Sequence, residues 1–417
     1  MKIKQLVLLS LLNLYANLLR LKRVFQSSKK SSDSVLLLPP ARFGSLGDEA
    51  MMTAVIEHFK AEGVKRVGFI SYSLARNWEN FNPAVKGINI ICHSLSDTWK
   101  ENFHLITVAS RYDKFYCLGA DVMDGFYSEQ SSLTRLKYVS LAVKTGAEAA
   151  ILGFSFNEKP APKVIEAFRN LSSEIKLYSR DPVSHKRLIN YLQRSVGLVA
   201  DLAFLLPPAE NPGVLSEILE WIKIQQENER ILIGINANSQ SFSNIDKESV
   251  HEIVKIYVDT LVEIYSKYQK CSFVLIPHDF RNTNKQSSDI GLSQAIMKAL
   301  PQEIKSDCVQ VPTPFSAAEI KFVCKHLDIV LTGRMHLCIA CLSQGTPVGC
   351  ITYQGKFQGL FEHIELDGML IDPEQASQPE HLSNFFIPLI QHREYNRQRI
   401  QKVIPKVKQL ALANFSS

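Results

Sequence analysis

Short apolar segments alternate with helical segments along almost the whole chain. Residues 35–38 (VLLL) form the first apolar segment, a turn with two glycines follows, and residues 50–60 have the apolar spacing of a helix. A strand, a glycine turn and a helix make up the opening unit of a doubly wound domain. Because the alternation is repeated further along, we expect parallel sheets with helices on both faces.

The predicted strands fall into two groups, and a proline-rich segment, residues 207–212 (PPAENP), separates them. The first group is 35–38, 67–70, 87–91, 115–118, 150–152 and 177–179, and the second is 231–235, 272–276, 308–311, 328–331 and 348–351. The predicted fold is α/β, with two doubly wound Rossmann-like domains that face a cleft in a GT-B-like arrangement. The expected parts are a basic amphipathic N-terminal helix and linker (1–34), an N-terminal α/β domain (35–208), a C-terminal α/β domain with the donor site (209–379) and a helical tail (380–417).

The composition is that of an ordinary globular protein, with 417 residues of which 46% are hydrophobic and 21% charged. The formal net charge of +6 is small for this length, so it does not indicate a nucleic-acid partner and fits an enzyme with anionic substrates. Cys338 and Cys341 form a CxxC pair inside an apolar helix, and no second pair completes a metal site. We therefore expect reduced, buried thiols rather than a metal or redox centre.

The first residues form an apolar run, residues 6–19, with basic residues on both sides. The run is too short for a comfortable membrane span, and Asn13 and Asn17 interrupt it. Two interpretations stay open at this point. The segment is either a basic amphipathic helix on a membrane surface or on a partner, or an ordinary helix docked on the protein itself. A signal peptide or signal anchor is less favoured, because no small-residue cleavage site follows.

Polar and charged side chains follow the predicted strands, at the edge where open α/β sheets bind ligands. These residues are Asp48, Asp121, Arg180, Asn236, His278, Arg334, His336 and Lys356. Arg334 and His336 open a helix, where backbone N–H groups favour an anion, and burying the pair without an anion would cost several kcal/mol. The fixed cations suit a ligand with more than one negative group, and a histidine exchanges protons near neutral pH.

The first glycine turn does not have the spacing of a nucleotide-binding loop, neither GxGxxG nor a P-loop. Gly44 and Gly47 would let a ligand approach the backbone, or they only reverse the chain. Asp48 is a ligand candidate, but we expect it to cap a helix that starts at Glu49. No Gly-x-Ser-x-Gly elbow or two-histidine metal signature is present, which disfavours a serine hydrolase and a zinc enzyme.

Several candidates also have structural interpretations. His278 either binds a ligand or pairs with the neighbouring Asp279. Arg180 either binds an anion or pairs with a carboxylate of the chain. We expect Asp201 and Asp328 to hold the backbone of turns rather than to react.

Five segments carry a resemblance to a known family. They are FGSLGDEAM near the start, SRDPVS in the middle, ADLAFLLP at the domain end, IPHD in the second domain, and TGRMHLCIACLSQGTPVGCITYQGKFQGLF. In this order they resemble the polysaccharide pyruvyltransferase family, over roughly residues 35 to 372. The last segment is the most specific. The family's first loop commonly reads Gly-Gly-x-Asn-x-Gly-Asp, whereas this chain has Ser45 in place of the asparagine.

The resemblance implies a GT-B-like fold and transfer of pyruvate from phosphoenolpyruvate to a sugar, usually as a cyclic ketal. Arg180, His336 and Lys356 match the family's functional arginine, histidine and lysine, and Arg334 would also touch the donor. We expect His336 to act as the proton donor. The donor is a substrate, so no cofactor is expected, and the scheme requires no metal.

The resemblance also implies partners and a setting. We expect an oligosaccharide or lipid-linked glycan as acceptor, a role in exopolysaccharide or cell-envelope biosynthesis, and no nucleic acid. A homo-oligomer is left open. We expect a cytoplasmic protein, with peripheral contact to the inner face of the membrane if the first helix binds lipid. The alternative function is a GT-B glycosyltransferase that uses a nucleotide sugar, and a non-catalytic glycan-binding protein is a third hypothesis.

Overall fold

The computed structural model describes residues 2–26, 34–40, 44–71, 85, 88–93, 96–210, 213–242, 249–281, 285–352 and 356–416, and of residues 2–6, 9, 26, 92 and 356 only the backbone. The chain divides into two compact units. Unit 1 consists of Met1–Arg42, Met51–Leu202 and Leu410–Ser417, and unit 2 of Phe43–Ala50 and Ala203–Gln409.

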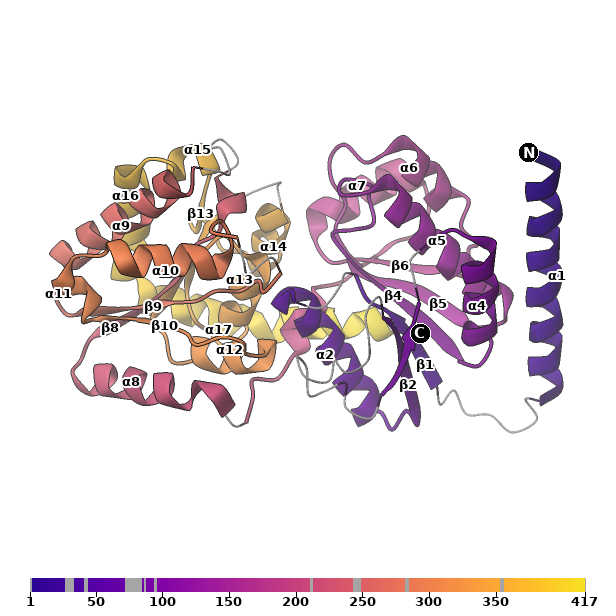
Figure 1. Ribbon diagram of the computed structural model, residues 1–417, viewed down its shortest axis with the longest axis horizontal. Coiled ribbons are helices and arrows are strands. Elements are labelled where there is room, and N and C mark those ends of the chain that lie inside the picture. Colours follow the sequence, from indigo (N-terminus) through magenta and orange to yellow (C-terminus); the bar gives the residue numbers. More distant parts are fainter. Residues whose placement is uncertain are drawn as a thin grey trace. The chain divides into compact units, whose positions relative to one another are not determined.

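Unit 1 contains a parallel sheet of seven described strands in the order β3-β2-β1-β4-β5-β6-β7. Figure 1 labels β1, β2, β4, β5 and β6 of this sheet. The strands are β1 (Ser34–Leu38), β2 (Arg66–Ser71), β3 (Asn89–Cys92), β4 (Lys114–Ala120), β5 (Glu148–Phe154), β6 (Lys176–Ser179) and β7 (Gly197–Leu198). The helices are α1 (Lys2–Gln26), α2 (Leu46–Ala61), α4 (Trp99–Ala109), α5 (Glu129–Lys144), α6 (Pro162–Arg169) and α7 (Pro182–Leu192), and the first residues of α2 belong to unit 2. The strand order reverses between β1 and β4, which makes that point the topological switch of this sheet.

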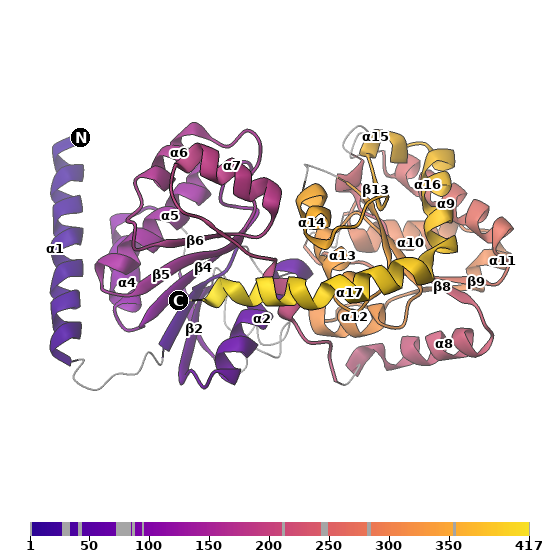
Figure 2. The same ribbon diagram turned by 180° about the vertical axis from the view of Figure 1, so that it is seen from behind.

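Unit 2 repeats the same order, with the described strands arranged as β10-β9-β8-β11-β12-β13, all parallel. They are β8 (Ile231–Asn236), β9 (Cys271–Leu275), β10 (Cys308–Gln310), β11 (Ile329–Thr332), β12 (Val348–Ile351) and β13 (Leu370–Ile371). The helices are α8 (Ser216–Glu227), α9 (Val250–Lys267), α10 (Asp289–Ala299), α11 (Gln302–Lys305), α12 (Ala317–Cys324), α13 (Met335–Leu342), α14 (Lys356–Ile364), α15 (Pro373–Ala376), α16 (Pro379–Gln391) and α17 (Arg393–Leu412). Helix α16 packs on α9 (Figure 2). The switch point lies between β8 and β11.

The strands are continuous apolar runs because helices cover both faces of each sheet. All residues of β1, β9, β11 and β12 are buried. Side-chain caps begin several helices. Asp181 accepts the backbone N–H of Ser184 at the start of α7, and Ser316 forms a capping box with Glu319 at the start of α12. Both caps were predicted, and they are confirmed. The prediction of two Rossmann-like domains is also confirmed.

The division into units differs from the predicted domain boundaries at three places. The chain leaves unit 1 after Leu202, before the proline-rich segment. Residues 203–205 belong to a short 3-10 helix, η2 (Leu202–Leu205). The C-terminal helices α16 and most of α17 belong to unit 2, and the last residues return to unit 1, where the Asn414 amide donates to the Ala200 carbonyl at 3.0 Å. The segment Phe43–Ala50, which holds the first glycine turn, belongs to unit 2.

Helix α1 is docked on unit 1, against α4 and α5 (Figure 1). Leu12 and Ala16 are buried there, and the Tyr15 hydroxyl lies 2.9 Å from the Thr107 hydroxyl. The interpretation of α1 as a helix docked on the protein is therefore confirmed. Among the described residues, no helix has the length and hydropathy needed to cross a bilayer.

Candidate functional site

Asn236, the last residue of β8, lies at the switch point of unit 2. Its side chain is fully buried and donates to the Ile276 carbonyl at 2.9 Å and to Asp289 Oδ2 at 3.1 Å. Thr332, the last residue of β11, donates its hydroxyl to Asn236 Oδ1 at 3.0 Å. Asn236, which we predicted to bind substrate, thus ties neighbouring strand ends together beneath the site.

Asp289, the first residue of α10, connects the parts of this site. It is 1% exposed and accepts the His278 backbone N–H at 3.0 Å, in addition to the Asn236 amide. It also accepts two hydrogen bonds from the Arg334 guanidinium, at 2.6 Å from Nη2 and 3.2 Å from Nε. Sequence reasoning missed Asp289, because no local spacing relates it to residues on other strands.

Arg334 occupies the N-cap position of α13 and is held by two carboxylates. Besides the pair with Asp289, its Nη1 lies 3.3 Å from Asp279 Oδ2, and Arg281 also pairs with Asp279 at 2.6 Å. Burial raises the pKa of Asp279, but the hydrogen bonds and charges of Arg281 and Arg334 outweigh this, so the pKa lies below its ordinary value. The chain itself therefore supplies the counter-charge that the sequence argument assigned to a ligand. This geometry fixes the direction of the Arg334 fork.

His336 lies in the first turn of α13, and Gly47 of the N-terminal glycine turn packs directly on its ring. A Cβ atom added to Gly47 would lie 2.2 Å from His336 Nδ1 and 2.5 Å from Cγ. The turn is attached to this edge of the sheet, because Gly44 accepts the Phe280 N–H at 2.7 Å and Ser45 forms a bridge with Asp279. The glycine at position 47 is thus required by the approach of a side chain, a role that the sequence did not reveal.

The helix after this turn begins earlier than expected. Helix α2 spans Leu46–Ala61, so Asp48 lies inside its first turn and the prediction that Asp48 caps a helix starting at Glu49 is wrong. Ser45 precedes the helix, and its hydroxyl accepts the Asp48 N–H at 3.4 Å. Serine and asparagine are about equally good caps. Ser45 therefore supplies a cap of the kind that an asparagine at this position would also supply.

Glu49 anchors the same segment to unit 2. It is 2% exposed, and its two carboxylate oxygens lie 3.2 and 3.1 Å from the Ala317 N–H at the start of α12. Burial, together with the charge of Glu319, raises the pKa of Glu49 well above its ordinary value, although the backbone hydrogen bond acts in the opposite direction. Gly47 is thereby held against His336 by contacts on both sides of it in the sequence, those of Gly44 and Ser45 before it and that of Glu49 after it.

His278 follows β9 and is buried beside His336 and Arg334. Burial and the charges of these two residues lower its pKa to about 3, and Asp279 acts in the opposite direction. At neutral pH His278 is therefore an uncharged imidazole. It can accept or donate a hydrogen bond, but without a ligand it does not hold the proton needed by a general acid.

This neutral histidine should make the fold sensitive to acid. Because its folded pKa lies below the ordinary value of 6.5, the unfolded chain binds the proton first, so stability is complete above about pH 6.5 and falls as pH decreases toward 3. The contribution of His278 to the change of the free energy of unfolding with pH approaches about 1.4 kcal/mol per pH unit. We expect His278→Gln to remove that share in urea unfolding between pH 7 and 5, whereas the exposed His251→Gln retains it. Equal slopes in the His278 variant and the parent would contradict the assignment.

In unit 1, Arg180 is the corresponding buried cation at the end of β6. Its Nη1 donates to Asp201 Oδ2 at 2.7 Å and its Nε to the Ser155 hydroxyl at 2.7 Å. Burial lowers the pKa of Arg180, but the carboxylates of Asp201, Asp121 and Asp181 raise it by more. The pKa of Arg180 therefore lies above its ordinary value. Its Nη2 is buried and has no hydrogen-bond partner among the described residues. Asp201, predicted to hold a turn, is thus the ion-pair partner of Arg180.

Asp121 follows β4 at the same edge of unit 1. The preceding residue, Ala120, has φ of +46°, a strained conformation for a residue with a side chain. The Tyr127 hydroxyl donates to Asp121 Oδ2 at 3.1 Å. Asp328, in contrast, accepts the Leu232 N–H at 2.7 Å, so its predicted role in holding the backbone is confirmed.

The predicted residues are distributed over both units. Asp121 and Arg180 belong to unit 1, and His278, Arg334 and His336 to unit 2, together with Asn236, Gly44, Gly47 and Asp48. Lys356 begins α14, but its side chain lies outside the described residues.

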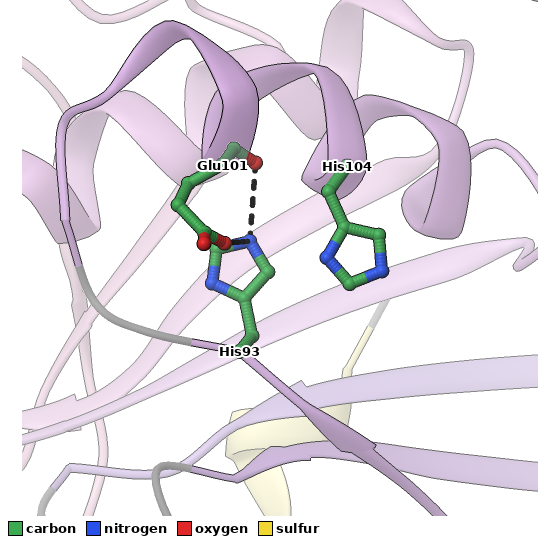
Figure 3. Close-up of side chains that lie close together, drawn as sticks. All are labelled: His93, Glu101 and His104. Atoms are coloured by element: carbon green, nitrogen blue, oxygen red, sulfur yellow. Dashed lines mark hydrogen bonds and ion pairs between the residues drawn. The ribbon is translucent and has the colours of Figure 1, made fainter.

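A second cluster of ligand-type side chains lies at the end of β3 and consists of His93, Glu101 and His104 (Figure 3). His93 Nε2 lies 3.1 Å from the Glu101 carbonyl and 3.1 Å from Glu101 Oε2. The rings of His93 and His104 are stacked at 5.2 Å with an angle of 8°. The cluster in this form connects α4 to β3.

Comparison with known proteins gives a family match and a fold match. A model of the family described as polysaccharide pyruvyl transferase matches residues 46–355. A protein from Listeria monocytogenes described as a UDP-N-acetylglucosamine 2-epimerase is 12% identical, with a TM-score of 0.59 over 93% of this chain and 97% of that one. A UDP-GlcNAc 2-epimerase from Neisseria meningitidis is 13% identical, with a TM-score of 0.53 over 90% of this chain and 97% of that one. A glycosyltransferase from Rickettsia africae is also 13% identical, with a TM-score of 0.51 over 93% of this chain and 100% of that one. At these identities the likeness shows the fold alone. Curated protein sequences give no match.

Proposed function

Since the chain belongs to the polysaccharide pyruvyl transferase family, we propose that it transfers a pyruvyl group from phosphoenolpyruvate to two hydroxyl groups of a glycan, as a cyclic ketal. The observation that carries this proposal is the set of groups at the switch point of unit 2. His336 stands at the start of α13 against Gly47, next to a guanidinium whose direction is fixed. A proton donor beside a cation and a helix N-terminus suits an anionic enol ester.

The proposed reaction begins with proton transfer from the His336 imidazolium to the methylene carbon of phosphoenolpyruvate. The electron pair of the C=C bond forms the new C–H bond, and the oxygen of one glycan hydroxyl adds to the neighbouring carbon. The C–O bond to phosphate breaks, and the second hydroxyl adds to the same carbon and closes the ketal. In sum, one hydroxyl proton replaces the proton that His336 gave to the methyl group, and the other leaves with inorganic phosphate.

The surrounding residues support this division of roles. His278 is neutral, because its pKa is lowered to about 3, so His336 is the better candidate for the acid. Arg334 would act on the anion from a fixed position. Arg180 belongs to unit 1 and is proposed only on the grounds of the family motif. Lys356 is proposed as a further cation on the grounds of the family motif. The scheme uses no metal and no cofactor.

The test is a reaction in D₂O with phosphoenolpyruvate and a panel of bacterial envelope glycans. We expect phosphate release that depends on both substrates, and a product whose pyruvyl methyl group carries one deuterium, measured by mass spectrometry. The deuterium reports proton donation to carbon and is absent if a preformed pyruvyl group is moved. Release of nucleoside diphosphate from a nucleotide sugar, with no use of phosphoenolpyruvate, would instead establish the glycosyltransferase alternative.

A further inference from the structure

Helix α1 has two apolar faces, of which the protein covers one. On the inner face, Leu12 and Ala16 are buried. The Arg23 guanidinium fixes the rotation of the helix, because it pairs with Asp113 at 2.8 Å and donates to the Tyr112 carbonyl at 2.7 Å. The Lys144 ammonium adds a hydrogen bond to Asn13 at 2.6 Å.

The opposite face carries a straight row of large apolar side chains that is exposed. Spaced alternately by four and three residues, the row has the period that keeps side chains on one line of a helix. We call it the outer stripe, and it extends over about 27 Å. Its members are Val7, Leu11, Leu14, Leu18, Leu21 and Phe25, and their exposure ranges from 48% for Leu11 to 84% for Phe25. Exposed apolar surface of this length and order indicates a binding face.

The charge around the stripe distinguishes between two possible binding partners, a second copy of α1 and a lipid surface. Apart from Arg23, which pairs with Asp113, the basic residues of this segment are Lys2, Lys4, Arg20, Lys22, Lys29 and Lys30, and no acidic residue precedes Asp33. Two copies of α1 paired along their stripes, in either direction, would bring only positive charges together, without the opposite charges that flank a helix pair. Anionic lipid head groups supply the missing negative charge, and the acyl region takes up the apolar row.

We propose that the outer stripe of α1 binds an anionic membrane surface, with the helix parallel to the membrane plane. The inner face stays on α4 and α5, so the whole protein is held at the membrane through a helix that is already folded. This binding is independent of the proposed pyruvyl transfer. If both hold, the enzyme is placed where glycans are carried on lipids.

The test is sedimentation of the full-length protein with vesicles of phosphatidylglycerol and phosphatidylcholine, compared with phosphatidylcholine alone. We expect binding to the anionic vesicles that weakens in high salt, and much less binding to the neutral ones. The double variant Leu14→Ser/Leu18→Ser should weaken binding about tenfold or more, with an unchanged melting temperature because both side chains are more than half exposed. A matched control, Ile224→Ser/Leu412→Ser, removes exposed apolar side chains from α8 and α17 and should bind like the parent.

Three outcomes would overturn the proposal. One is no binding to anionic vesicles, and another is equal loss in the stripe variant and the control. The third is a dimer in lipid-free solution, seen by light scattering, that dissociates in the stripe variant, since the occupant would then be a second copy of the chain.

Discussion

Replacing His336 with glutamine is expected to reduce pyruvyl transfer by about a hundred- to ten-thousand-fold, the range that a general acid contributes. Glutamine is similar in size and polar, but it does not protonate carbon. Binding of phosphoenolpyruvate should largely survive, because the Arg334 guanidinium keeps its own partners, Asp289 and Asp279. Single-turnover kinetics and calorimetric titration of the donor measure the two effects separately.

The comparison variant is His278→Gln. Since His278 is neutral at neutral pH, its loss should lower turnover much less than the loss of His336. Turnover close to that of the parent in His336→Gln, with a large loss in His278→Gln, would assign the acid to His278. Arg334→Ala should weaken donor binding as well as turnover, because it removes a cation from the anion site.

Adding one methyl group at Gly47 is expected to have an effect of similar kind, with activity lowered about a hundredfold. The new Cβ would lie 2.2 Å from His336 Nδ1, so the imidazole must move, and a displacement of about 1 Å in a reacting group has a cost of this order. Because alanine is a better helix residue than glycine, the loss of stability from the clash should be partly offset. The measurements are kcat and the melting temperature of Gly47→Ala.

A double-mutant cycle decides whether Gly47 acts through His336. The variant Gly47→Ala/His336→Gln should be no slower than His336→Gln alone, because the displaced group no longer contributes to the reaction. Losses that multiply in the double variant would mean that Gly47 supports the reaction by another route, such as the attachment of the segment Phe43–Ala50 to unit 2.

Much of the fold is a local property of the sequence. Short apolar runs predicted the buried parallel strands, and the spacing of apolar side chains predicted α9 and α13 with their observed bounds. Asp181 before Pro182 and Ser316 before Glu319 predicted two helix starts, because caps depend on residues a few positions apart. The edge of the sheet on which His336 lies followed from the same information, since the carboxyl ends of parallel strands meet at one edge.

The partners of these residues depend on contacts between distant parts of the chain. Asp289 and Arg334 are 45 positions apart, and Glu49 and Ala317 are 268 apart, so no periodicity relates them. For this reason the sequence indicated an uncompensated Arg334, whereas the folded chain supplies two carboxylates. The contact between Gly47 and His336 has the same origin, because the packing of the first glycine turn on the second sheet determines it.

Helix α1 shows the same limit. Its amphipathic pattern is compatible with a membrane surface and with the protein itself, because both offer an apolar environment. Only the tertiary structure determines which side chains face α4 and α5, and hence which ones remain exposed. The sequence by itself thus determined most of the buried strands, several of the helices and the type of residue at each strand end. Packing between distant segments decided which of those residues are paired, neutral or exposed.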